Sequence, residues 1–152
     1  KDDLRLYLMG VVDGEGCICP AFKQNGYIGL FVSVQMASAE VIDLFQSEWG
    51  GSTRSRDGTK KGYARLFVWT VTGTGAIAFL QYAAEHSIVK QEQAQCGLLL
   101  AYEMAKYKGA RQGVNNRRGE KCITPADKEM RKGLALKIKA ANGARSRFDA
   151  QQ

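Results

Sequence analysis

Two pairs of segments in this chain alternate apolar and polar residues, as the arms of β-hairpins do. Gln24-Asn25-Gly26 separates the first pair, and Asp57-Gly58 lies between the arms of the second. Both are turn signals, and strands joined by short turns pair antiparallel. The expected strands are residues 16–23, 28–36, 52–57 and 63–72. The pattern therefore predicts a four-stranded antiparallel sheet.

Apolar residues at helical spacing precede and follow each hairpin. Gly14-Glu15-Gly16 is expected to end the first helix, and Ser38 is the expected N-cap of the second, which Gly50-Gly51 stops. The expected helices are residues 3–13, 39–49, 74–85, 91–106 and one that begins at Thr124-Pro125. The order αββαββααα predicts an α+β fold, with helices on one face of the sheet and a C-terminal helical extension. The 152 residues are expected to form one domain, 1–152.

The net charge of +7 is unevenly distributed along the chain. Residues 1–105 hold 9 Lys and Arg against 11 Asp and Glu, whereas residues 106–152 hold 13 against 4. A basic region beside a nearly neutral body is typical of proteins that bind nucleic acid, because Lys and Arg neutralise phosphates and release counterions. A basic surface or tail that contacts only solvent is the alternative.

Cysteine and histidine usage excludes several kinds of site. Cys17, Cys19, Cys96 and Cys122 include no C-x-x-C pair, and the only histidine is His86, so neither a zinc site nor a Ser-His or Cys-His nucleophile is expected. Reduced, buried thiols are the simpler interpretation. No stretch has the length of a membrane span, so we expect a soluble, intracellular protein without a membrane partner.

A sheet that is covered by helices on one side leaves its other face open. The residues expected there are Lys23, Tyr27, Ser33, Gln35, Arg54, Arg56 and Arg65. Antiparallel ribbons can enter the major groove of DNA, where Arg and Gln recognise bases by paired hydrogen bonds. Polar residues that simply face water are the alternative.

Residues 8–16 read LMGVVDGEG and resemble the LAGLIDADG motif. With the αββαββα order, the chain resembles a single-motif, homodimeric LAGLIDADG homing endonuclease; Met9 is a departure at the second motif position. Gly10 and Gly14 lie on one helix face, where a partner helix can approach closely. Two Glu15 carboxylates near a twofold axis would repel each other unless cations separated them. Such a pair suits Mg²⁺, which keeps positions for water and phosphate oxygens.

The resemblance implies a Mg²⁺-dependent enzyme that makes a double-strand break in a long, pseudo-palindromic DNA target. It implies that Glu15 is the metal-binding catalytic acid, with the carbonyl of Gly14 as a further ligand. Lys90 matches the basic residue near the scissile phosphate, and Gln35 the polar residue that orders water, although Met36 aligns if the strand shifts by one. Asp13 is expected to have a structural role. The second basic residue that the family often places after Gln35 is missing.

The resemblance also implies contacts to DNA beyond the sheet face. Asn25 in the first turn, Arg117 and Arg118 in the Gly- and Arg-rich stretch at 107–121, and Arg145 and Arg147 after the last helix are expected to bind the duplex. A LAGLIDADG protein that binds without cutting, as an RNA maturase or a DNA-binding regulator, remains the alternative. A module that stacks single-stranded RNA on exposed sheet aromatics is a further one.

Overall fold

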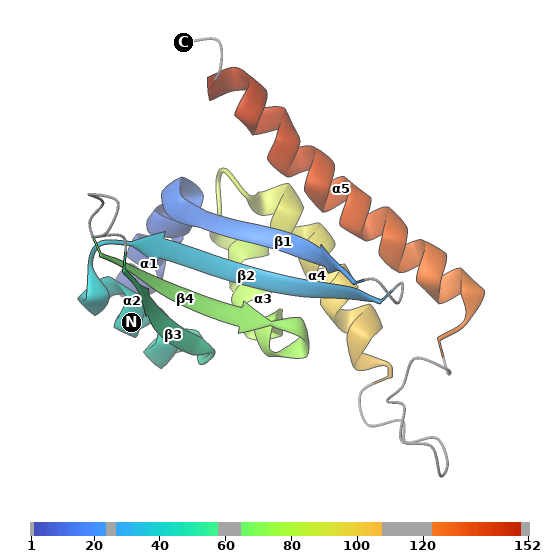
Figure 1. The fold of residues 1–152 in the computed structure, drawn as a ribbon, viewed down its shortest axis with the longest axis horizontal. Helices are drawn as coiled ribbons and strands as arrows, with labels where there is room; N and C mark the ends of the chain where they lie inside the picture. The colour runs from blue at the N-terminus through green and yellow to red at the C-terminus, as the bar shows by residue number, and fades with distance from the viewer. Residues whose placement is uncertain (1, 24–26, 58–64, 108–122, 150–152) are drawn as a thin grey trace.

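A computed structural model describes residues 2–23, 27–57, 65–107 and 123–149 (Figure 1). Its elements follow the predicted order, with a short 3-10 helix, η2, before α3. They are α1 (Asp2–Glu15), β1 (Gly16–Phe22), β2 (Ile28–Met36), α2 (Ala39–Trp49), β3 (Ser52–Arg56), β4 (Leu66–Thr72), η2 (Gly73–Ala76), α3 (Ile77–His86), α4 (Gln91–Ala105) and α5 (Pro125–Asp149).

The strands form one four-stranded antiparallel sheet, which confirms the prediction, and their order in it is β1-β2-β4-β3. In its register Val32 pairs with Ile18 on one side and with Val71 on the other, and all three side chains are buried. Helices α1 to α4 lie behind the sheet in Figure 1. One face is therefore the core, and alternate residues of each strand point to the opposite, open face.

The core under β3 and β4 is built around aromatic rings. Trp69 of β4 stacks on Phe45 of α2 with ring centroids 5.1 Å apart, and contacts Phe79 of α3 at 5.4 Å. The indole N–H of Trp69 donates to the Gly50 carbonyl over 2.7 Å, so the ring also fixes the end of α2. As predicted, Ser38 caps α2 by accepting the N–H of Val41.

The first helix is longer than the sequence predicts. It continues through Gly14 to Glu15, whereas residue 13 was the expected end. Gly14 is exposed and costs the helix only its weak propensity. The stop is Gly16, where a Cβ atom would lie 2.6 Å from the Val12 carbonyl oxygen. Glu15 is thus the last helical residue, and not a residue beyond the helix.

Helix α5 runs beside the edge strand β1 and packs against α4 (Figure 1). The Asn142 side-chain amide donates to the Ile18 carbonyl over 2.9 Å, which satisfies an outward-facing group of the edge strand. The side chains of Ala135 and Ile138 complete the core. None of the described helices is apolar over enough residues to span a bilayer.

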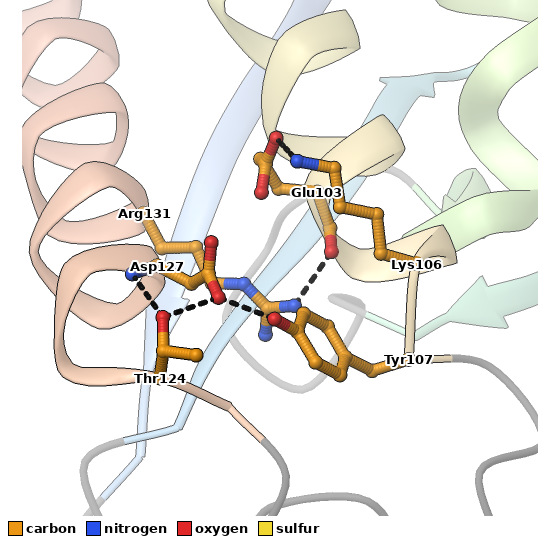
Figure 2. Close-up of polar contacts among 6 residues, drawn as sticks. All are labelled: Glu103, Lys106, Tyr107, Thr124, Asp127 and Arg131. Carbon is orange, nitrogen blue, oxygen red and sulfur yellow. Dashed lines mark hydrogen bonds and ion pairs between the residues drawn. The ribbon is translucent and has the colours of Figure 1, made fainter.

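A polar cluster joins the end of α4 to the start of α5 (Figure 2). The buried Arg131 guanidinium donates to the Glu103 carbonyl over 2.7 Å and lies over the ring of Tyr107. Asp127 accepts hydrogen bonds from the hydroxyls of Tyr107 and Thr124. Thr124 also accepts the Asp127 N–H and so caps α5 at the point where the sequence predicts this helix to begin.

Candidate active site

Asp13 connects the end of α1 to the turn between α3 and α4. Its carboxylate accepts the Ser87 hydroxyl over 2.5 Å and the Ile88 N–H over 3.0 Å. Burial works to raise the pKa of Asp13, but the hydrogen bonds from Ser87 and from the main-chain N–H groups of residues 88–90 outweigh it and lower the pKa. Asp13 therefore forms a charged structural link, in keeping with the role predicted for it.

Lys90 lies immediately before α4 and is only 9% exposed. Its Nζ donates to the Asp13 carbonyl over 2.9 Å, and its main-chain N–H donates to the Ser87 hydroxyl over 2.8 Å. Lys90 is therefore not the solvent-exposed lysine that would be ordinary for a residue just before a helix. The structure places an ammonium group at the C-terminal end of α1, 77 residues away in the chain.

Glu15 and Gly14 are exposed at this same helix end. The last carbonyl groups of a helix have no partner within the helix and carry a partial negative charge, so they attract cations. Together with the Glu15 carboxylate they form an all-oxygen donor set, which is the chemistry that Mg²⁺ prefers. Within the parts of the chain that the structure describes, no three His, Cys, Asp or Glu side chains gather into a metal site.

The register brings Gln35 to the end of α1. Gly16, the residue after Glu15, pairs with Val34, so Gln35 lies beside the point where the helix passes into β1. Gln35 is exposed on the open face, whereas Met36 packs against the core. Alternation along β2 thus selects Gln35 and not Met36 as the residue that faces outward here.

Arg54 and Arg56 share the open face and this end of the sheet. Arg54 pairs with Val68, which pairs with Gln35, so the two outer residues of this row lie roughly 10 Å apart across the strands. Ser33 occupies the next row, between Cys17 and Thr70.

The other expected DNA-binding residues have different positions. The ammonium of Lys23 lies 5.2 Å from the ring centre of Tyr27, at the opposite end of the sheet. Arg65 is exposed just before β4. Because side chains alternate along a strand, residue 65 is on the same side as the core-facing Phe67, and it does not share the open face with Arg54. Arg145 and Arg147 lie within α5 and not after it, because α5 continues to Asp149. Asn25, Arg117 and Arg118 lie outside the described residues, as do the side chains of Arg145 and Arg147.

One side of α1 is open and partly apolar. Leu6 and Tyr7 are 50% and 55% exposed, and a Cβ atom at Gly10 or Gly14 would meet nothing within 4 Å. Leu6, Gly10 and Gly14 are spaced four residues apart and therefore line one face. This face has the room that a second helix would need for a close approach.

The described thiols are free but less buried than the sequence predicts, and Cys122 lies outside the described residues. Cys17 and Cys19 are half-buried on the open face, and their sulfur atoms lie 2.8 Å apart. The hydrogen bond from Cys19, together with the charge of Lys90, lowers the pKa of Cys17 to about 6, and the same contact raises the pKa of Cys19. The sequence does contain a signal for this placement, because two cysteines separated by one residue in a half-exposed strand lie on the same face. Ser87 gave no such signal, because its link to Asp13 spans 74 residues.

Comparison with solved structures shows a common fold at low sequence identity. The homing endonuclease I-CvuI, in complex with the I-CreI target, has a TM-score of 0.69 and 17% identity over 92% of this chain and 82% of that one. The archaeal intron-encoded homing endonuclease I-Vdi141I, complexed with DNA, has a TM-score of 0.66 and 17% identity over 93% and 86%. The LAGLIDADG meganuclease I-AabMI, bound to uncleaved DNA, has a TM-score of 0.55 and 12% identity over 70% of this chain and 39% of its own.

The chain has the fold of the LAGLIDADG homing endonucleases. A scan against protein families and a search of curated proteins each find no match.

Proposed function

We propose that this protein is a site-specific DNA endonuclease that hydrolyses phosphodiester bonds in both strands of a long target. The observation that carries the proposal is the meeting of three elements at one point: Glu15 is the last residue of α1, Lys90 immediately precedes α4, and Gln35 lies one residue before the end of β2. An acid, a cation and a polar side chain beside an open sheet face are the groups that metal-assisted phosphodiester hydrolysis needs. The homing endonucleases that share the fold were solved with DNA, which supports the substrate class.

The donor set at the end of α1 suits Mg²⁺, with the Glu15 carboxylate and the Gly14 carbonyl as its ligands from this chain. A divalent cation bound there would act as a Lewis acid for the scissile phosphate. Structures of I-CvuI were solved with DNA in the presence of Mg or of Ca, in keeping with a divalent cation. The chain's own contribution is to hold both oxygen donors on a helix end that Asp13 and Ser87 fix in place.

Lys90 would stabilise the negative charge that develops on the phosphate during hydrolysis. Its side chain is already desolvated and oriented by the Asp13 carbonyl, so little reorganisation is needed when substrate binds. Gln35 would orient the attacking water through its side-chain amide. Both residues act from rigid elements, which is how a catalytic arrangement keeps its geometry.

The active species in this proposal is a C2 homodimer joined along α1. Gly10 and Gly14 leave the room for a second α1, and Leu6 and Tyr7 are apolar residues that the partner would cover. The longer LAGLIDADG meganuclease I-AabMI is covered over only 39% of its length, in keeping with a chain that supplies one half of a site. Two Glu15 residues would then serve the two strands, and the target would be pseudo-palindromic.

The open face would contact the major groove. By their positions along the sheet, Arg54 and Arg56 would meet bases near the centre of the target, whereas Lys23 and Tyr27 would meet bases further out. Asn25, which lies outside the described residues, remains a proposed base contact. Arg117, Arg118, Arg145 and Arg147 would bind phosphates and position the duplex without reading its sequence. Ser33 completes the proposed DNA-binding set on this face, whereas Arg65 lies off it.

The test is a cleavage selection on a randomised pool of long duplexes, with and without Mg²⁺, beside a binding assay with structured RNA. We expect a metal-dependent double-strand break that enriches a pseudo-palindromic sequence. Binding to structured RNA with no cut in any duplex would favour the maturase instead. Specific duplex binding without a cut in the presence of Mg²⁺ would favour a DNA-binding regulator.

A further inference from the structure

Two cysteines lie side by side where the proposed active site meets the open face of the sheet. Ile18 between them is completely buried, so Cys17 and Cys19 both point to the open face. Their sulfur atoms are 2.8 Å apart, and one thiol donates a hydrogen bond to the other. Cys19 also lies 3.6 Å from the side-chain amide of Asn142 in α5. Neither thiol has a part in the proposed hydrolysis.

We propose that Cys17 and Cys19 form a reversible dithiol–disulfide site, and that closing the disulfide weakens DNA binding at the adjacent sheet face. The first half stands on the arrangement of the two thiols alone. The second half rests on the proposed function, because it assumes that the open face binds DNA.

The spacing of the two cysteines favours a disulfide that is easily reduced. Residues i and i+2 of a strand are roughly 6.6–6.8 Å apart at Cα, which is the upper end of the range that a disulfide spans. The sulfur atoms have to approach from 2.8 Å to the bonded distance of about 2.05 Å, and a slight contraction of the strand would bring the Cα atoms closer to the usual separation of about 5.5–6 Å. Such strain makes a disulfide more oxidising, as is typical of labile and regulatory ones.

The oxidation balances with a small-molecule disulfide such as glutathione disulfide as the oxidant. The thiolate of one cysteine attacks a glutathione sulfur, so a mixed disulfide forms and one glutathione leaves as the thiol. The second cysteine then attacks the protein sulfur of the mixed disulfide and releases the second glutathione. The protein loses two protons and two electrons in total, and the glutathione disulfide gains both.

Contraction between residues 17 and 19 would change the surface around them. Cys17 pairs with Ser33 in the row next to Gln35, and it follows the proposed metal ligand Glu15 by two residues. Asn142 contacts both the Ile18 carbonyl and Cys19, so a shift of this segment would also disturb the contact between β1 and α5. Oxidation would therefore alter the open face at the position where we propose that DNA binds.

The chemical half is tested on the full chain without DNA, by titration with glutathione disulfide, tryptic digestion and mass spectrometry. Trypsin isolates Cys17 and Cys19 in the peptide of residues 6–23, away from Cys96 and Cys122. We expect that peptide to lose two hydrogen atoms and its alkylatable thiols, and dithiothreitol to restore both. The C19S variant should instead carry one glutathione on Cys17. Two results would overturn the proposal. One is a glutathione that stays bound to Cys17 in the natural chain, and the other is that Cys17 and Cys19 both remain free thiols when Cys96 is fully oxidised.

The functional half compares duplex binding and cleavage by the reduced and oxidised proteins. We expect oxidation to weaken binding, reduction to restore it, and the C17S/C19S double variant to resist oxidation, whereas the control C96S responds like the natural chain. An oxidised protein that carries the 17–19 disulfide and binds equally well would refute this half. If the reduced protein neither binds nor cuts DNA, the proposed function fails, and this half with it, while the peptide map still decides the disulfide.

Discussion

The ammonium nitrogen of Lys90 donates a hydrogen bond to the main-chain carbonyl of Asp13 over 2.9 Å. A residue at the start of α4 is thereby fixed at the C-terminal end of α1. The Asp13 carboxylate completes the link by accepting the Ser87 hydroxyl, which in turn accepts the main-chain N–H of Lys90. This closed set of hydrogen bonds gives the proposed active site a rigid base, and each of its members can be tested.

Replacing Lys90 by methionine should slow cleavage much more than it weakens DNA binding. Methionine keeps most of the side-chain volume but removes the charge that would stabilise the transition state. A roughly 10²-fold loss in cleavage rate is expected, as for other single electrostatic donors. Single-turnover cleavage and duplex affinity should be measured together. The matched control is K139M, an exposed lysine of α5 outside the proposed site. An equal loss of rate and affinity would assign Lys90 to binding alone.

Asp13 should make stability depend on pH at the acid end. Its pKa is below the ordinary 3.8, so the carboxylate stabilises the fold above that pH, and the contribution is lost as pH falls through the folded-state pKa. The D13N variant should lose about 2 kcal/mol at neutral pH, the size of a hydrogen bond to a charged group, and show a shallower acid limb. Denaturant unfolding at several pH values measures both. The matched control is D43N, at an exposed aspartate of α2 that takes no part in this hydrogen-bonded link.

Replacing Gly10 by leucine should weaken the proposed dimer without destabilising the fold of a single chain. The side chain meets nothing in one chain, and the helix gains about 0.5–1 kcal/mol when a glycine is removed from its interior. The same side chain would block the close approach of a second α1 and dissociate the dimer. Sedimentation and thermal unfolding of the dilute protein test the two effects. The control is G133L in α5, where a Cβ also meets nothing within 4 Å. A dimer that survives G10L would place the interface elsewhere.

Arg54 and the pair Arg117 and Arg118 should differ in how their loss affects binding. The R54A change should relax base preference at one or two positions, at a cost of about 1–3 kcal/mol against the preferred base. Replacing Arg117 and Arg118 by alanine should weaken specific and nonspecific duplexes equally. It should also reduce the slope of log affinity against log salt by roughly 0.9 for each phosphate that the protein no longer neutralises. An unchanged slope would show that these two arginines only meet solvent.

The parts of the fold that depend on local pattern were predictable from the sequence. Alternation fixed β1 and β2 to within a residue, and Ser38 and Gly50 marked the ends of α2. The end of α1 was missed, because the close contact of Gly16 with Val12 appears only once the helix passes into the strand.

The candidate site was predictable only in part, because its contacts join distant segments. Glu15 and Gln35 came from a motif and a strand pattern, and the register of β1 and β2 explains their proximity. The links from Asp13 to Ser87 and Lys90 cross more than 70 residues, and no local pattern indicates them. The sulfur contact of Cys17 and Cys19 depends on side-chain orientation, which the spacing alone does not give.

The most direct test of the account is cleavage and binding of the selected duplex by the E15Q variant. Glutamine keeps the size of Glu15 but removes the charge that would bind the cation, so we expect cleavage to be abolished while affinity changes little. Ca²⁺ should support binding by the natural chain with little or no cleavage, because its longer and looser coordination positions the reacting groups poorly. Cleavage by E15Q at the rate of the natural chain would contradict the account.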